Sequence, residues 1–309
     1  MTDAPTATIV VPTFNRPAML RRCLDAIARL EATTSFEVVV VDDGGPESLD
    51  TLVAAYADRL HLRLIRQPRG GPAAARNAGV AAARGRYLVF IDDDCTAAPG
   101  WLAEFVRELA RDDRRLLGGC VENALTGNPY STASEHISQF VYQYNRTDAA
   151  HEPFFTTNNI ALAADLFRAV GGFTTSIPSA TAEDKEFCDR WRAHGLCLAH
   201  VPSAIVHHAH DLTFTQFLRQ HFEYGRGILV FRLIRRRRTG GALFPEPAGF
   251  YAGLLLSPIT HASSAGRWRL MALLAAAQLA TLAGALREAF TWAQPVNRAS
   301  DSRPPLDQA

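Results

Sequence analysis

Several features that would narrow the function of this chain are missing from its sequence, beginning with an excess of charge. Its 32 lysines and arginines nearly balance its 31 aspartates and glutamates, which leaves a net charge of +1 over 309 residues. Long-range attraction of nucleic acid needs a basic excess, so we expect no nucleic-acid partner. Any charged site must therefore be a local cluster.

Cysteine pairs and a leader segment are missing as well. The five cysteines are odd in number, show no Cys-x-x-Cys spacing and mostly fall within apolar patterns. This usage predicts reduced core thiols in the cytoplasm rather than a disulfide framework or a zinc site. The first residues, MTDAPTATIV, have no basic segment followed by a long apolar one, so we expect no secretory signal. We also find no internal repeat and no low-complexity linker.

The sequence up to Asp94 instead alternates short apolar runs with segments of helical periodicity. The predicted strands are Thr8 to Pro12, Phe36 to Asp43, Leu62 to Ile65 and Tyr87 to Ile91. The predicted helices follow Pro17, cover Leu49 to Leu60, and run from Pro72 to Gly85. Such alternation gives a mainly parallel sheet with helices on both faces. We therefore predict a doubly wound α/β domain.

Beyond Asp94 the pattern is less regular. We predict a helix around Trp101 to Leu109, a strand around Leu116 to Val121, and a polar, loop-rich stretch to about Phe155. Two further helices are expected near Asp165 to Val170 and from Glu183 to His194. The corresponding divisions are residues 1–125, residues 126–230 of the same domain, and a basic and apolar helical tail over residues 231–309.

Polar residues follow three of the predicted strands. Pro12 to Asn15 come after the first, Asp42 and Asp43 close the second, and Asp92 to Asp94 follow the fourth. In parallel sheets of this kind, ligands bind outside the carboxyl ends of the strands. We expect these three loops to converge on one rim.

The three aspartates are the sharpest feature of that rim. If the strand stays extended, Asp92 and Asp94 point to one side and Asp93 to the other. Two converging carboxylates favour a divalent cation, which accepts oxygen ligands from carboxylates and substrate phosphates. The alternative is a solvated acidic turn, or a cap for the helix that follows.

Two other polar stretches of the sequence can each be interpreted either as a binding site or as ordinary structure. Asp42 and Asp43 could accept hydrogen bonds from a base or a ribose, but Asp-Gly is also ordinary turn chemistry. The stretch Gly70 to Gly79 offers glycines, a helix start whose amides suit an anion, and Arg76 as a diphosphate contact. Its alanines are equally typical of simple packing.

Six stretches, in order, resemble the family 2 inverting glycosyltransferases, which have the nucleotide-sugar-binding fold called GT-A. They are VVPTFNRPAMLRRCLDAI, VVVVDDGG, GPAAARNAGVAAARGRYLVFIDDDC, NNIALAADLFRAVGGF, AEDKEFCDRWRAHG and VHHAHDLTFTQFLRQHFEYGRG. Together they extend from about Thr8 to Gly227. The resemblance implies a GT-A-type fold and a sugar transfer from a nucleotide diphosphate.

The resemblance also implies roles for individual residues. Donor binding falls to Pro12, Thr13, Phe14, Asn15, Arg16, Asp42, Asp43, Arg76, Asn77, Asp92 and Asp93. Asp92 and Asp94 would hold Mn²⁺ or Mg²⁺, with His208, and to a lesser degree His210 and His207, near the metal or diphosphate. Asp184 would be the general base, next to Glu183. On spacing alone, these acids could simply favour a helix N-terminus, and the histidines could belong to a polar connector.

The C-terminal tail allows two interpretations. A dense basic run, Arg232 to Arg238, precedes apolar segments at Phe250 to Ile259 and Leu270 to Leu286. Basic clusters beside apolar helices are typical of chains held at the inner, anionic face of a membrane. The alternative is a helical hairpin packed on the catalytic domain, because the apolar segments are short and rich in alanine.

Together with these patterns, the resemblance implies a metal-dependent inverting glycosyltransferase. Its donor would be a nucleotide-diphosphate sugar, with UDP as the default base by resemblance, and its acceptor a hydroxyl of a glycan or a lipid-linked molecule. A sugar-nucleotide nucleotidyltransferase is the nearest rival, but that reaction has no use for a base at Asp184. A non-catalytic sugar-nucleotide-binding protein is the remaining alternative.

Overall fold

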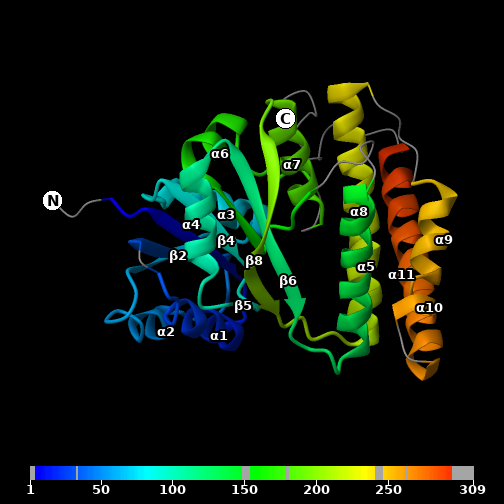
Figure 1. The fold of residues 1–309 in the computed structure, drawn as a ribbon, viewed down its shortest axis with the longest axis horizontal. Helices are drawn as coiled ribbons and strands as arrows, with labels where there is room; N and C mark the ends of the chain where they lie inside the picture. The colour runs from blue at the N-terminus through cyan, green and yellow to red at the C-terminus, as the bar shows by residue number, and fades with distance from the viewer. Residues whose placement is uncertain are drawn as a thin grey trace. The chain divides into compact units, whose positions relative to one another are not determined.

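A computed structural model describes residues 4–32, 34–147, 154–177, 181–240, 246–261 and 264–293. The chain forms two compact units, and Figure 1 follows its helices and strands in order. The first unit consists of Met1–Ala124, Phe154–Thr175 and Phe187–Ala209. The second consists of Leu125–Pro153, Ser176–Glu186 and His210–Ala309.

The first unit is built on one sheet of eight strands (Figure 1). The strands are β1 (Ala7–Thr13), β2 (Phe36–Asp42), β3 (Leu62–Arg66), β4 (Tyr87–Ile91), β5 (Cys95–Ala97), β6 (Arg115–Asn123), β7 (Asn159–Ala163) and β8 (Cys197–His208). Their order is β3-β2-β1-β4-β7-β6-β8-β5. The first four strands pair in parallel, as do β6 and β8, while β7 is antiparallel to both of its neighbours and β5 to β8. The predicted mainly parallel α/β fold is confirmed.

Helices cover both faces of this sheet because successive strand residues point to opposite sides. Ile9 lies on the face covered by α1 (Pro17–Ile27), α2 (Asp50–Ala54) and α4 (Trp101–Arg111). Val10 lies on the face covered by α3 (Pro72–Ala82), α6 (Ala164–Val170) and the part of α7 (Glu183–Ala193) that begins at Phe187. Burial of the strands on both faces explains why they read as continuous apolar runs.

Two sequence expectations for the first unit need correction. The helix predicted over Leu49 to Leu60 ends at Ala54, and turns continue to Arg59. Strand β4 ends at Ile91, so Asp92 is not in a strand and Asp93 and Asp94 form a turn instead of continuing the extended chain. The simple alternation expected for the aspartates therefore does not apply.

Five helices dominate the second unit. They are α5 (Pro129–Thr147), α8 (Phe214–Thr239), α9 (Ala248–Leu256), α10 (Pro258–His261) and α11 (Ser264–Ala293). The predicted helical tail is confirmed, but the loop-rich stretch expected before Phe155 is wrong, because α5 occupies most of it. Tyr130, Ala133 and Ile137 recur at helical spacing on α5 and pack with Phe217 and Leu273.

Candidate functional site

The turn after β4 brings its three carboxylates next to two arginines. Arg16, just before α1, places Nη2 2.5 Å from Asp93 Oδ1 and Nη1 2.9 Å from Asp94 Oδ2. Arg76, buried on α3, places Nη2 2.7 Å from Asp92 Oδ1. Each aspartate therefore has a cationic partner, which offsets the repulsion among three adjacent negative charges.

Asp93 is the buried member of the three. Burial raises the pKa of Asp93 to about 7, with the charge of Asp94 adding to the rise and that of Arg16 opposing it. Thr13 Oγ1, at the end of β1, donates a hydrogen bond of 2.6 Å to Asp93 Oδ2. This carboxylate therefore ties the β4 turn to the neighbouring strand end.

Asp94 faces the end of β8. His208 Nε2 lies 3.4 Å from Asp94 Oδ1, and these groups and the Cys95 sulfur all lie within 4.8 Å of one another. Burial raises the pKa of the Cys95 thiol well above its ordinary value, so the sulfur stays protonated and is a poor ligand. A carboxylate beside an imidazole suits Mn²⁺ better than Mg²⁺, so the side chains fit a divalent cation.

The contact of Cys95 with His208 could not be predicted from the sequence. The two residues are register partners in the antiparallel pair of β5 and β8. Strand β5 has only three residues, which is too short to give a readable pattern. The contact between Asp94 and His208 therefore follows from strand pairing rather than from sequence spacing.

Asp42 and Asp43 are both buried at the end of β2. The Asp43 carboxylate accepts hydrogen bonds of 2.8 Å from the backbone N–H groups of Gly70 and Gly71, and Asp42 Oδ1 accepts one of 2.9 Å from the N–H of Gly45. These bonds tie the β2 end to its own turn and to the loop before α3. Both carboxylates shape the rim of the sheet.

The loop after β1 carries the remaining predicted donor residues. Pro12 is buried within β1, whereas Asn15 is exposed and has a φ of 53°, a left-handed conformation that Asn tolerates better than most residues. The Phe14 ring lies 4.0 Å from the Arg69 guanidinium. An aromatic face and an exposed polar turn thus lie beside the aspartates' partner Arg16.

Asn77 is engaged with the chain itself. Its Nδ2 donates to the backbone carbonyl of Phe173 at 2.8 Å, and its Oδ1 accepts from the Phe173 N–H at 2.9 Å. The amide thereby joins α3 to the loop after α6. In this geometry the Asn77 side chain holds α3 against the loop at Phe173.

Three predicted residues belong to the second unit: Glu183, Asp184 and His210. Glu183 is buried, and its Oε2 accepts a 3.2 Å hydrogen bond from the N–H of Ala182. Asp184 is half-buried in the first turn of α7 and accepts a 2.7 Å bond from the N–H of Lys185. Asp184 is therefore the more accessible carboxylate of the two, and the helix N-terminus favours its ionised form.

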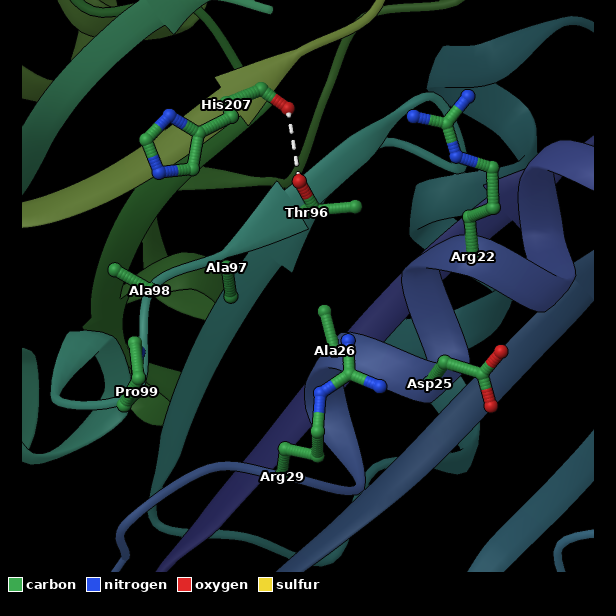
Figure 2. Close-up of a pocket in the computed structure, with 9 residues that line it drawn as sticks. All are labelled: Arg22, Asp25, Ala26, Arg29, Thr96, Ala97, Ala98, Pro99 and His207. Carbon is green, nitrogen blue, oxygen red and sulfur yellow. Dashed lines mark hydrogen bonds between the residues drawn. The ribbon is translucent and has the colours of Figure 1, made fainter.

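A hollow of about 450 Å³ lies between α1 and β5 (Figure 2). Its polar lining includes Arg22, Asp25 and Arg29 on or just after α1, with Thr96 and His207 opposite. Figure 2 shows Thr96 Oγ1 bonded to the His207 carbonyl, at 3.4 Å. Of the candidate residues, only the lesser histidine candidate His207 lines this hollow; Asp92, Asp94 and His208 do not.

Comparison with known families gives a match over the core of the first unit. The model described as Glycosyl transferase family 2 matches residues 8–171, more than half of the 309 residues. A validoxylamine A glucosyltransferase from Streptomyces hygroscopicus is 29% identical over 221 residues, 62% of this chain and 52% of that protein. A pre-mycofactocin glycosyltransferase from Mycobacterium tuberculosis is 29% identical, over 71% of this chain and 46% of its own length. The chain thus spans about half the length of these curated relatives.

Solved structures support the fold. A mannosyltransferase from Pyrobaculum calidifontis, solved with GDP-Man and Mn²⁺, has a TM-score of 0.68 at 20% identity, covering 94% of this chain and 88% of its own. The TarS 1-349 structure from S. aureus with UDP has a TM-score of 0.52 at 18% identity, covering 97% and 98%. Both are similar to this chain in the arrangement of their sheet and helices.

Proposed function

The chain belongs to glycosyl transferase family 2, and we propose that it moves one sugar from a nucleotide-diphosphate donor to a hydroxyl acceptor with inversion and with a divalent cation. UDP is the base we propose first, and GDP is the alternative that the mannosyltransferase neighbour suggests. The observation that carries the proposal is the aspartate turn, where carboxylates, two arginines and His208 meet at a strand end.

The leaving-group side of the reaction is assigned to the first unit. Asp92, Asp94 and His208 would hold the cation, with His210 as a second imidazole candidate, and Mn²⁺ would act there as a Lewis acid on the diphosphate. Arg16 and Arg76 would add charge-assisted hydrogen bonds to phosphate oxygens. Donor binding is proposed for Asn77 on α3 and for the strand ends and turns that carry Pro12, Thr13, Phe14, Asn15, Asp42, Asp43 and Asp93.

Asp184 is the proposed general base. It would take the proton of the acceptor hydroxyl as the new bond to the anomeric carbon forms. The bond from that carbon to the diphosphate breaks at the same time, and the departing nucleoside diphosphate keeps the electron pair. Glu183, which is buried and bonded to backbone, would hold the first turn of α7 in place.

We expect Asp184→Asn to reduce turnover at least 100-fold while leaving nucleotide affinity within about twofold of the parent, because only the proton transfer is removed. Nucleoside diphosphate release measures turnover, calorimetry measures affinity, and NMR of the product reports the anomeric configuration. Asp165→Asn, an exposed change at the start of α6, is the matched control. Full activity of Asp184→Asn would favour the nucleotidyltransferase alternative, and a retained configuration would contradict inversion.

The domain assignment is also a proposal. We assign residues 1–125 to donor binding, 126–230 to acceptor binding and catalysis, and 231–309 to a tail that associates with a membrane surface. An acceptor in the cell envelope or on a lipid, and a cytoplasmic enzyme held at the inner face of the membrane, would follow from that tail. The support is the single helix among the described residues that is long and apolar enough to cross a membrane, Gly266–Trp292.

A further inference from the structure

Helix α11 exposes an apolar face over most of its length. Its exposed large residues are Trp268, Leu279, Leu282, Leu286 and Phe290, which are 50% to 70% exposed. Their spacing returns to the same side of a helix every three or four residues, and from first to last they extend about 33 Å. Leu256 and Ile259 are also exposed on α9 and α10, which contact α11 within the second unit (Figure 1).

The charges around this apolar face are of one sign. From Ala248 to Ala293 the chain has three arginines, at 267, 269 and 287, and a single acidic residue, Glu288. Glu288 is buried, and its Oε2 accepts a 2.9 Å bond from Arg226 Nε on α8. Among the described residues from 248 to 293, every charged side chain that is not buried is therefore an arginine, which is complementary to an anionic surface.

The opposite side of α11 is closely packed against α8. A Cβ on Gly225 would come within 1.8 Å of the Thr281 carbonyl oxygen, and one on Gly284 within 1.9 Å of the Phe222 carbonyl oxygen. A helix that crosses a bilayer alone could not keep this contact, and Glu288 would lose its partner Arg226 in hydrocarbon. Although its composition would permit a span, its packing requires α11 to stay with α8.

The basic run at the end of α8 is partly used inside the protein. Arg232 pairs with Glu246 at 3.2 Å, and Arg238 pairs with Glu186 at 3.1 Å. These arginines are thus already neutralised by carboxylates. The exposed Arg236 and Arg237 of this run could meet lipid headgroups in addition to the arginines that border the apolar face.

We propose that α11 lies in the plane of an anionic membrane surface, with the face from Trp268 to Phe290 inserted at the headgroup boundary and Arg269 and Arg287 paired with lipid phosphates. This deepens, and rests on, the tail association proposed above. Interfacial helices of this kind have one apolar and one protein-facing or polar side, and they do not cross the bilayer. The side toward α8 remains in contact with protein.

The first experiment is flotation of the full chain with vesicles of phosphatidylcholine, with and without phosphatidylglycerol. We expect binding to the anionic vesicles, and a loss of about 25-fold for Arg269→Gln/Arg287→Gln, at about fivefold per arginine. Arg111→Gln/Arg114→Gln, with the same charge change on exposed residues of the first unit, should bind like the parent. Leu282→Glu/Leu286→Glu should abolish binding while a thermal melt shows an intact fold.

Depth measurements distinguish a helix that lies in the surface from one that spans. In a Trp268→Phe/Trp292→Phe background, which leaves only the buried Trp101 and Trp191 of the first unit, tryptophans introduced by Leu279→Trp or Phe290→Trp should be quenched by brominated lipids. Their depth should be the same shallow depth as that of Trp268 in a Trp292→Phe variant. A spanning helix would instead place position 279 near the bilayer centre and position 290 near one surface. That pattern would overturn the proposal.

The alternative is that a second copy of the chain binds the apolar face of α11. Sedimentation showing a dimer that Leu282→Glu/Leu286→Glu dissociates, without vesicle binding by the parent, would also overturn the proposal. Nucleoside diphosphate release with a water-soluble acceptor is measured in parallel. Vesicle binding without turnover would count against the proposed enzyme activity alone, whereas turnover without vesicle binding would count against the membrane inference alone.

Discussion

At the scale of single residues, the three aspartates after β4 have different surroundings although they are neighbours in the chain. Asp93 is buried and bonded to Thr13, Asp92 is paired with buried Arg76, and Asp94 faces His208. Asp93 thus serves the fold of the turn, which leaves Asp92 and Asp94 as the carboxylates we propose for the cation. These aspartates differ in role because they differ in burial and in bonding partners.

Glu37 shows the same dependence on surroundings at a site remote from the aspartates. This buried carboxylate on β2 accepts hydrogen bonds from Thr8 Oγ1 at 2.8 Å and from the N–H of Arg84 at 2.7 Å, and it pairs with Arg63 at 3.0 Å. Burial by itself would raise the pKa of Glu37, but the bonds from Arg84 and Thr8 and the charge of Arg63 bring it below the ordinary value of 4.5. The ionised form therefore stabilises the fold.

We expect Glu37→Gln to lower the free energy of unfolding by about 1–3 kcal/mol at neutral pH, because charge-assisted bonds are lost in a buried setting. The folded state lowers the pKa of Glu37, so its contribution to the free energy of unfolding is complete above about pH 4.5. That contribution is lost as the pH falls through the pKa of the folded state. The variant's deficit should shrink over the same range. Urea unfolding at a series of pH values measures this.

Glu47→Gln is the control for that series, since Glu47 is exposed. Its free energy of unfolding should stay within about 0.5 kcal/mol of the parent at every pH. A Glu37→Gln deficit that did not change with pH, or that grew as the pH fell, would show that the carboxylate's charge is not what stabilises this region.

At the scale of elements, the contact of α8 with α11 depends on glycines. Gly225→Ala would force a methyl group against the Thr281 carbonyl, so we expect a loss of about 3 kcal/mol or a displaced α11. Gly249→Ala is the matched control, because that helical glycine on α9 faces open space and alanine should be neutral or stabilising by up to about 1 kcal/mol. Chemical unfolding measures both, and equal effects would contradict the close packing.

Some strands could be predicted from the sequence pattern and others could not. The runs that became β1 to β4 were predictable because both faces of these strands are buried, which leaves continuous apolar residues. Strand β8 was not predicted, because only Val201, Ala204 and Val206 among its apolar residues are buried and its register shifts opposite Gly119. Its partners, rather than its own pattern, hold it in the sheet.

Helix α5 was not predicted from the sequence for a related reason. Its aromatic residues Phe140 and Tyr144 lie four residues apart, as on one face of a helix, but the polar residues around them give a low mean hydropathy that resembles a loop. Tyr144 packs edge-on against Phe250 at 4.8 Å, a contact that is remote in sequence. Such long-range aromatic contacts stabilise the helix and cannot be read locally.

At the scale of the whole molecule, the order of the strands predicted where three polar loops meet better than it predicted the contacts between them. The carboxyl ends of parallel strands share an edge, so the convergence of the loops after β1, β2 and β4 followed from topology. The pairing of Arg16 with Asp93 and Asp94 did not, because it depends on how the loop before α1 turns. The position of this rim could therefore be predicted from the sequence, whereas the ion pairs along it could not.

The most direct test of this account is a calorimetric titration of the full chain with UDP, and with GDP, in Mn²⁺ and in a chelator. We predict affinity that requires Mn²⁺ and that falls at least tenfold, about 1.4 kcal/mol, in Asp94→Ala. Asp113→Ala, which removes a surface partner of Arg86, should bind like the parent. Nucleotide affinity that is the same in chelator as in Mn²⁺, together with an Asp94→Ala variant indistinguishable from the parent, would contradict the account.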